Sequence, residues 1–262
     1  MDFSVTDQRL FTRAIVRKPG ASFVNGITTS CLGKPDYDKA MEQHQFYINA
    51  LRQCGLEVIV LEADDLYPDS TFVEDTAVLT GKCAIIANPG AESRKGETEA
   101  MQHEIEKYFN HIETIQKPGT LDGGDVMEVG DHYFIGISGR TNTEGAGQLL
   151  QILNRYGYSG SMIEIKNFLH LKSGVAYLGN GNILAAGELI GQEAFQRLNL
   201  IPVDASESLA ANCIRVNNFV IIPTEYPKLK GVLTHKGHAV IEIDMSEFQK
   251  MDGGLSCLSL RF

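Results

Sequence analysis

The sequence predicts an α/β fold, a five-bladed α/β propeller whose ring is closed by pairing of the N- and C-terminal strands. Three observations support this fold: repeated strand–turn–strand segments, a helical pattern after most of them, and a single strand at each end of the chain. Closure would remove exposed strand edges, which favours the ring. No Pro- or Ser-rich linker divides the 262 residues, so we expect one domain over residues 1–262.

Four segments have the pattern of a β-hairpin, with two apolar runs joined by a short turn. The turns are Gly-Lys, Gly-Asp, Gly-Asn-Gly and Asn-Asn, which are typical of tight hairpins. Gly81, Gly130 and Gly179 are equally spaced along the chain, and Asn217 follows after a shorter interval. This regular spacing indicates a repeated structural unit. The hairpin segments are residues 75–89, 124–139, 174–187 and 212–225.

Each hairpin is followed by a helical pattern and then by a short β-branched run. Thr143 is the expected N-cap of the second helix, and Gly157 its C-terminal stop. The first part of the chain supplies a helix and a trailing strand but no hairpin, so strands 13–19 and 257–262 would pair in its place. The expected helices are 36–55, 98–110, 143–156, 188–198 and, weakly marked, 227–236. The expected trailing strands are 56–62, 112–116, 161–166, 200–205 and 239–245.

Composition excludes several classes of protein. A formal net charge of −10 disfavours non-specific binding to nucleic acid. No apolar run approaches the ~18–20 residues that span a bilayer, and residues 1–10 lack the layout of a signal peptide. Five cysteines without a C-x-x-C pair indicate a reducing compartment and no structural zinc site. We therefore expect a cytoplasmic protein without nucleic-acid or membrane partners, either a monomer or a homodimer.

Polar residues gather at the hairpin ends that would share one mouth of the ring. In an antiparallel hairpin, the start of the first strand and the end of the second lie at the same end. Taken singly, each residue has a structural explanation, such as a buried thiol, a core histidine, a turn aspartate or a surface arginine. The residues are Asp69, Glu74, Asp75, Asp122, His170, Asn212 and Cys257 at the strand starts, and Arg94 and Arg140 at the strand ends.

Taken together, these residue types point to one chemistry. A cysteine, a histidine and a carboxylate form a nucleophile, a proton shuttle and an orienting group. Neighbouring carboxylates repel each other unless a cation lies between them, and a guanidinium presents a planar fork of donors to them. Two arginines suit a carboxylate at the other end of the ligand. These features predict a ligand that is arginine or a derivative of it.

Six motifs resemble the dimethylarginine dimethylaminohydrolase family, within the guanidino-group-modifying (pentein) superfamily. The resemblance covers nearly the full length and implies the five-bladed α/β propeller. It rests on FVEDTAVL (72–79), NPGAESRKGE (88–97), LDGGDVMEVG (121–130), GISGRTN (136–142), LHLKSG (169–174) and DGGLSCLS (252–259).

The resemblance also implies residue roles. Cys257 corresponds to the nucleophile, His170 to the general acid and base, and Asp122 to the carboxylate that holds the histidine. Residues 19–27 resemble the family's mobile lid, and no cofactor or metal is implied.

The resemblance also implies the substrate-binding positions. Asp69, Glu74 and Asp75 correspond to the carboxylates that bind the guanidinium, and Phe72 to a ring that packs beside the substrate. Arg94 and Arg140 correspond to the residues that bind its amino-acid end, and Ile27 and Met251 to backbone contacts.

The substrate is the remaining question at this stage. Arginine deiminases and amidinotransferases typically carry H-x-D at the catalytic histidine, whereas this chain has His170-Leu171-Lys172. The chain is also too short for the extra helical domain of arginine deiminases. Both observations favour N-omega-methylated L-arginine, converted to L-citrulline through a covalent S-alkylthiouronium on Cys257. Two alternatives stay open: a related hydrolase of unmethylated arginine or citrulline, and a propeller that binds arginine-like ligands without catalysis.

Overall fold

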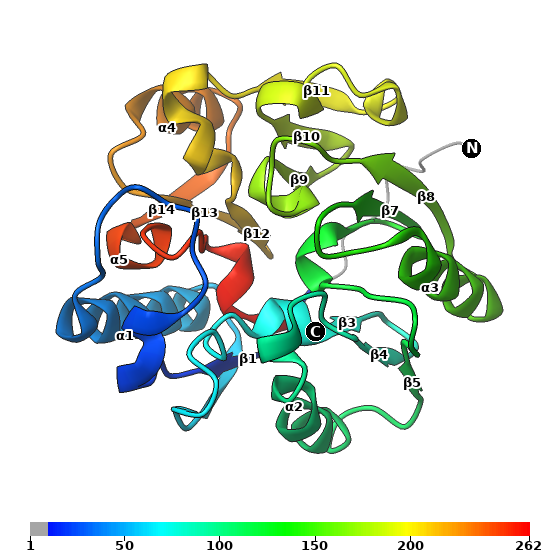
Figure 1. Ribbon diagram of the computed structural model, residues 1–262. Coiled ribbons are helices and arrows are strands. Elements are labelled where there is room, and N and C mark those ends of the chain that lie inside the picture. Colours follow the sequence, from blue (N-terminus) through cyan, green and yellow to red (C-terminus); the bar gives the residue numbers. More distant parts are fainter. Residues whose placement is uncertain (1–9) are drawn as a thin grey trace.

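A computed structural model describes residues 10–262, and within this range five three-stranded sheets surround a common centre (Figure 1). In each sheet the first two strands pair antiparallel and the third joins parallel to the middle one. From the inner to the outer strand, the sheets are β15 (Leu260–Arg261), β1 (Arg13–Arg17) and β2 (Glu57–Leu61); β3 (Ala77–Leu79), β4 (Ala84–Ile86) and β5 (Ile112–Thr114); β6 (Val126–Val129), β7 (His132–Ile137) and β8 (Ser159–Glu164); β9 (Val175–Gly179), β10 (Asn182–Ala185) and β11 (Asn199–Pro202); and β12 (Ile214–Val216), β13 (Phe219–Pro223) and β14 (Ala239–Ile243).

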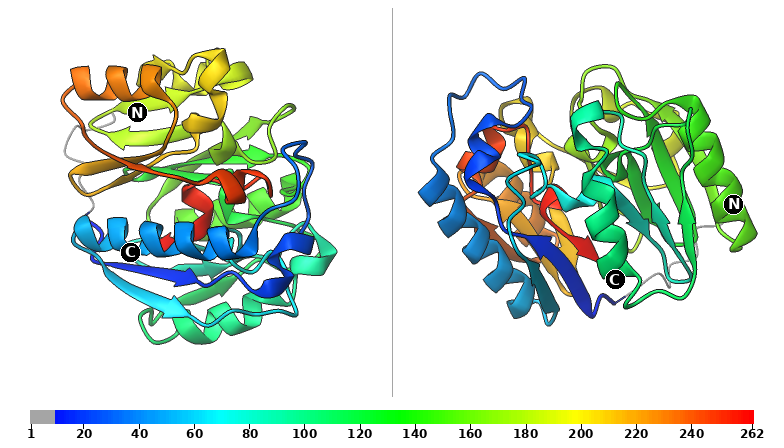
Figure 2. Two further views of the ribbon diagram at one scale, coloured as in Figure 1. Left: turned by 90° about the vertical axis from the view of Figure 1, so that its left-hand side faces the viewer. Right: turned by 60° about the horizontal axis from the view of Figure 1, so that its bottom comes forward.

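The four longer α-helices within residues 10–262 connect the middle strand of a sheet to its outer strand and lie outside the ring, whereas the short helix α5 lies between β14 and β15 in the chain (Figures 1 and 2). The N-cap of α3 is Asn142, whose side chain accepts a hydrogen bond from the Gly145 N–H at 2.8 Å. The expected cap at Thr143 is therefore wrong by one residue, because it is the Asn142 oxygen that accepts from the amide of the third helical residue. The helices are α1 (Tyr37–Gln53), α2 (Glu97–Ile105), α3 (Thr143–Arg155), α4 (Pro227–His235) and α5 (Ser246–Gln249).

The expected α-helix over residues 188–198 does not form. Two short 3-10 helices, Gly187–Leu189 and Glu193–Phe195, replace it. Gly187, directly before the segment, has a left-handed φ of +52°, and Gly191 lies between the two 3-10 helices, so one glycine stands at the start of the segment and another inside it. The apolar residues still reach the core, where Leu189 and Phe195 are buried. The apolar residues are therefore buried as their spacing predicts, but these glycines prevent a continuous helix.

The two terminal strands pair as expected and close the ring. β1 and β15 are antiparallel, with Ala14 opposite Arg261 and Ile15 opposite Leu260. Phe262 extends the pairing, because its carbonyl accepts from the Thr12 and Arg13 amides. This pair takes the place of the hairpin that the first sheet lacks.

The core consists of five apolar clusters, and each one joins two neighbouring sheets. One cluster combines Ile15 and Leu260 of the first sheet with Leu79 and Ile86 of the second. Another joins the fifth sheet back to the first. Since every consecutive pair of sheets is packed in this way, the sheets form a closed ring. Among residues 10–262, no helix has the length and apolarity to cross a membrane. The N-terminal stretch examined for a signal peptide lies, apart from Leu10, outside the described residues.

Closure of the ring gives a direct test with two leucines. Leu260 is 4% exposed in the closing strand, whereas Leu66 is 84% exposed in a loop. Leu260→Ala should lower the free energy of unfolding by about 2–5 kcal/mol, because it leaves a cavity between two sheets. Leu66→Ala should change it by less than about 0.5 kcal/mol. Urea unfolding of both variants measures the difference, and equal effects would contradict the packed closing strand.

Candidate active site

Short 3-10 helices precede the inner strands and carry the site. Val73–Thr76 leads into β3, Gly123–Asp125 into β6, Leu171–Ser173 into β9 and Ser256–Leu258 into β15. These turns bring residues from distant parts of the sequence to a small pocket of about 30 Å³. The pocket is lined by Ile27, Asp69, Phe72, Asp75, Arg94, Arg140, Leu169, His170, Met251, Asp252, Gly253 and Cys257.

His170 is held by a buried carboxylate. Its Nε2 lies 3.0 Å from Asp122 Oδ2, and Asp122 Oδ1 accepts from the Gly90 amide at 2.8 Å. Asp122 is fully buried and lies behind the histidine rather than in the pocket wall. Burial lowers the pKa of His170, but the negative charge of Asp75 and the hydrogen bond to Asp122 outweigh burial and raise that pKa to about 9. The geometry therefore favours a protonated imidazole near neutral pH.

Asp75 joins the histidine to a buried arginine. Its Oδ1 accepts from the Gly124 amide at 3.0 Å and lies 3.9 Å from His170 Nε2, while its Oδ2 accepts from Arg94 Nη1 at 2.5 Å. Burial raises the pKa of Asp75, but the charges of His170 and Arg94 lower it to about 2. Gly124 is required here, because a Cβ would come within 2.8 Å of both Asp75 Oδ1 and His170 Nδ1.

The two arginines of the pocket differ in how far they are already bonded. Arg94 is 5% exposed, and its Nε and Nη2 donate to Glu97 at 3.0 and 2.7 Å. Its Nη2 also donates to the Phe72 carbonyl at 2.9 Å. The Arg140 side chain is half-buried and makes no hydrogen bond or ion pair within residues 10–262. Arg140 is therefore the arginine with donors available for a ligand.

The predicted lid lies over this pocket. Its Ile27 amide donates to Asp69 Oδ1 at 3.1 Å, and Phe72 packs against Phe23 with ring centroids 6.0 Å apart. Burial raises the pKa of Asp69, partly offset by the charge of Arg94 and by the Ile27 amide. The pocket volume corresponds to about two water molecules.

Cys257 is buried beside an amide and a hydroxyl group. Asn212 Nδ2 donates to Cys257 Sγ at 3.7 Å, and Asn212 Oδ1 accepts from the Ser256 amide at 3.0 Å. Burial, and then the negative charges of Glu74 and Asp75, raise the pKa of the Cys257 thiol to about 12. Without a bound cation, the site thus holds Cys257 as a thiol.

Glu74 and Lys172 both lie outside the pocket that contains Cys257. Glu74 does not line the pocket; its carboxylate accepts from Lys172 Nζ at 2.6 Å and from Ser256 Oγ at 2.8 Å. Lys172, two residues after His170, likewise lines a different cavity. Neither side chain contributes to the pocket wall in this structure.

One group of described residues has the spacing of metal ligands, namely Asp75, Asp122 and His170, whose ligand atoms lie within 4.8 Å of one another. These atoms already have protein partners, because Arg94 pairs with Asp75 and His170 is bonded to Asp122. A guanidinium next to the carboxylates opposes a second cation. The donor set therefore suits proton transfer better than metal binding.

Sequence reasoning gave no role to three residues that support the site. Glu97 holds Arg94, and its position three residues later in the motif NPGAESRKGE was the available signal. Asn212 was placed at the mouth, but its contact with Cys257 needed coordinates. Asp125 accepts from the Leu171 amide at 2.9 Å and from Ser138 and Thr141 at 2.7 Å each. It thereby fixes the turn that carries His170.

Comparisons with known proteins agree with this site. The sequence profile described as N,N dimethylarginine dimethylhydrolase, eukaryotic, matches residues 34–258. The N(G),N(G)-dimethylarginine dimethylaminohydrolase of Pseudomonas aeruginosa is 50% identical over 97% of this chain and 100% of its own length. This chain belongs to the dimethylarginine dimethylaminohydrolase family. The enzyme of the same name from Streptomyces coelicolor is 34% identical over 95% of this chain and 96% of its own length.

Solved structures support the family and the fold. The structure of the Pseudomonas aeruginosa dimethylarginine dimethylaminohydrolase, a cysteine-to-serine mutant complexed with citrulline, has a TM-score of 0.96 at 49% identity. It covers 97% of this chain and 100% of its own. The N-terminal domain of ArgZ, a cyanobacterial arginine dihydrolase, has a TM-score of 0.87 at 19% identity and covers 95% of this chain and 96% of its own. This second likeness shows the shared fold.

The protonated state of His170 gives a pH prediction. Folding raises its pKa from 6.5 to about 9, so the stabilisation is fully present below pH 6.5 and is lost as pH rises through 9. Unfolding free energy should fall by at most about 3 kcal/mol over this window. Urea unfolding at several pH values measures it. His170→Asn should lack this decline, and an equal decline in both proteins would argue against a protonated His170.

Proposed function

We propose that this protein hydrolyses N-omega-methylated L-arginine to L-citrulline and the corresponding methylamine. The observation that carries the proposal is one pocket with Cys257 and His170 beside carboxylates and with an unpaired Arg140 in the same wall. Membership of the dimethylarginine dimethylaminohydrolase family supports it, because relatives at 50% and 34% identity carry that activity in their names. The citrulline complex of the Pseudomonas aeruginosa enzyme supports citrulline as the product.

The charges of the pocket fit the two ends of such a substrate. Asp69 and Asp75 are two of the three aspartates that line the pocket, and a guanidinium can donate to both. The third, Asp252, already accepts from the Thr28 hydroxyl and the Thr29 amide. Arg140 suits the substrate carboxylate, since its own donors have no partner in the described chain. Arg94 acts mainly through Asp75, because most of its donors are engaged.

The chemistry proceeds in two steps. Cys257 thiolate attacks the central guanidinium carbon, and the C–N bond to the methylated nitrogen breaks as His170 donates a proton to the departing amine. This leaves an S-alkylthiouronium on Cys257 and a neutral imidazole. His170 then takes a proton from a water molecule that attacks the same carbon. Cys257 leaves as thiolate, the remaining hydroxyl proton is lost to solvent as the carbonyl forms, and citrulline is released. Asp122 holds the imidazole in place through both steps.

The substrate itself assists formation of the thiolate. In the free site, burial and two carboxylates keep the pKa of Cys257 at about 12. A guanidinium bound beside Sγ adds a positive charge at that point and lowers the pKa of the thiol. The nucleophile is thus activated when substrate is present and remains protonated when it is absent.

Cytoplasmic location is part of the same proposal. The five cysteines are all unpaired, and four of them are buried. Free thiols of this kind are typical of a reducing compartment. The buried thiol of Cys257 in particular must stay reduced for the proposed chemistry.

Citrulline release distinguishes the proposed function from its nearest alternative. Purified protein is offered asymmetric dimethylarginine, monomethylarginine and arginine in parallel, with Cys257→Ser as control. We expect citrulline from both methylated substrates, little from arginine and none from the variant. Product mainly from arginine would assign the enzyme to a related branch of the superfamily. Full activity of Cys257→Ser would overturn the covalent chemistry.

Because Arg140 is unpaired in the described chain and most donors of Arg94 are engaged, replacing Arg140 should weaken substrate binding, whereas replacing Arg94 should lower stability. Arg140→Ala should raise KM at least about tenfold, because it removes a charge-assisted contact to the substrate, with unfolding free energy nearly unchanged. Arg94→Ala should lower the unfolding free energy by about 3–5 kcal/mol, because Asp75 and Glu97 stay buried without their partner. Steady-state kinetics and urea unfolding measure both. Loss of stability in Arg140→Ala, or an unchanged KM, would contradict this division.

A further inference from the structure

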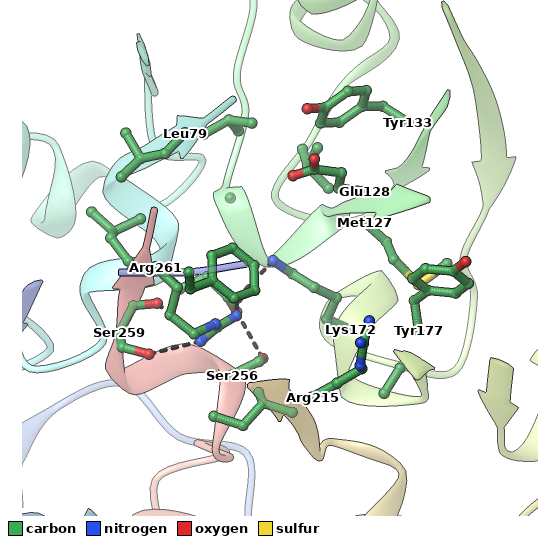
Figure 3. A pocket seen from close by; sticks show the side chains of 18 of the residues that line it. Leu79, Met127, Glu128, Tyr133, Lys172, Tyr177, Arg215, Ser256, Ser259 and Arg261 are labelled. Atoms are coloured by element: carbon green, nitrogen blue, oxygen red, sulfur yellow. Dashed lines mark hydrogen bonds and ion pairs between the residues drawn. The ribbon is translucent and has the colours of Figure 1, made fainter. Parts of the chain in front are cut away.

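A second cavity, of about 180 Å³, lies along the centre of the ring (Figure 3). Residues of the inner strands β3, β6, β9, β12 and β15 all line it, so it occupies the channel that the five sheets enclose. None of its lining residues lines the pocket of Cys257. It is therefore a separate compartment, several times larger than that pocket.

A thin wall separates the two compartments, and adjacent residues face opposite sides of it. Asp75 and Cys257 line the pocket, whereas their neighbours Glu74 and Ser256 line the channel cavity. Glu74 accepts hydrogen bonds from Lys172 Nζ at 2.6 Å and from Ser256 Oγ at 2.8 Å, and all three residues line the channel cavity.

Three cationic side chains enter the cavity from different elements: Lys172 from the turn before β9, Arg215 from β12 and Arg261 from β15 (Figure 3). Lys172 is paired with Glu74. Arg261 donates to Ser259 Oγ at 2.7 Å and is 3.8 Å from Glu74. Within residues 10–262 the Arg215 side chain has no hydrogen bond and no ion pair.

Arg215 is held inside the cavity rather than in open solvent. It is half-buried, and its guanidinium lies on the backbone of Gly179, where a Cβ would come within 2.2 Å of Nη1. A partly buried charge without a partner is unfavourable. Of the carboxylates in the lining, Glu74 is bonded to Lys172 and Ser256, and within residues 10–262 Arg215 forms an ion pair with neither Glu74 nor Glu128.

We propose that this channel cavity is a binding site for a small oxyanion, a carboxylate or a phosphate, held by Arg215 and Arg261. Guanidinium groups present forked donors that match two oxygens of such a group. The volume suits an inorganic anion or a small organic acid rather than a larger ligand. The site is independent of the substrate pocket and of the reaction proposed for it.

Isothermal titration calorimetry with sodium phosphate, and separately with sodium malonate, tests the site at constant ionic strength. Saturable binding of at least one anion is expected for the wild-type protein. Arg215→Gln should weaken it at least about tenfold, because it removes the unpaired charge from the cavity. Comparison of the two anions distinguishes a phosphate site from a carboxylate site.

Two matched variants locate the binding. Arg52→Gln removes an exposed arginine of α1, and Arg140→Gln removes the unpaired arginine of the substrate pocket. Neither should change the affinity. Absence of saturable binding, or loss of binding in Arg140→Gln with Arg215→Gln unaffected, would overturn the proposal. Arg215→Lys keeps the charge without the fork and should bind more weakly than wild type but more tightly than Arg215→Gln, which serves as a second test should the glutamine variant not fold.

Discussion

Antiparallel pairing of β15 with β1 is the constraint on which the rest of the structure depends. The pairing places the last strand of the chain inside the ring, where Leu260 packs between the first and second sheets. Cys257 lies directly before this strand, in the turn that enters it. A thiol close to a chain terminus is ordinarily mobile. Here the closing strand fixes its position relative to His170, which enters the site from the fourth sheet.

The site combines charges that would be unfavourable individually. Arg94 compensates Asp75 and Glu97, and Asp75 together with Asp122 favours a protonated His170. Burial, together with the carboxylates of Glu74 and Asp75, disfavours a negative charge on Cys257. Cys257 is consequently a neutral thiol when no ligand is bound, and it becomes a reactive thiolate only when a cationic ligand binds beside it. Electrostatics thus link substrate recognition to activation of the nucleophile.

The repeat allowed the ring, its closure and most strands to be predicted, because hairpin turns and β-branched runs are local signals. The α-helix expected over residues 188–198 was wrong, because its apolar spacing is typical of a helix but Gly187 and Gly191 disfavour a continuous one. The site was predicted as a set of residues at one mouth, which topology alone specifies. Topology did not reveal that Glu74 faces away from Asp75, that Arg94 is saturated while Arg140 is not, or that Asn212 contacts Cys257. Those facts depend on side-chain direction within a turn.

The turns before β3 and β15 each present one residue to the substrate pocket and the preceding one to the channel. A one-residue insertion or deletion in either turn would therefore exchange the two faces, bringing Glu74 or Ser256 where Asp75 or Cys257 belongs. Length variation, which loops ordinarily tolerate during evolution, is unavailable to these segments. Evolution of either compartment must therefore proceed by side-chain substitution. A substitution that faces one compartment also changes the residue next to one that faces the other.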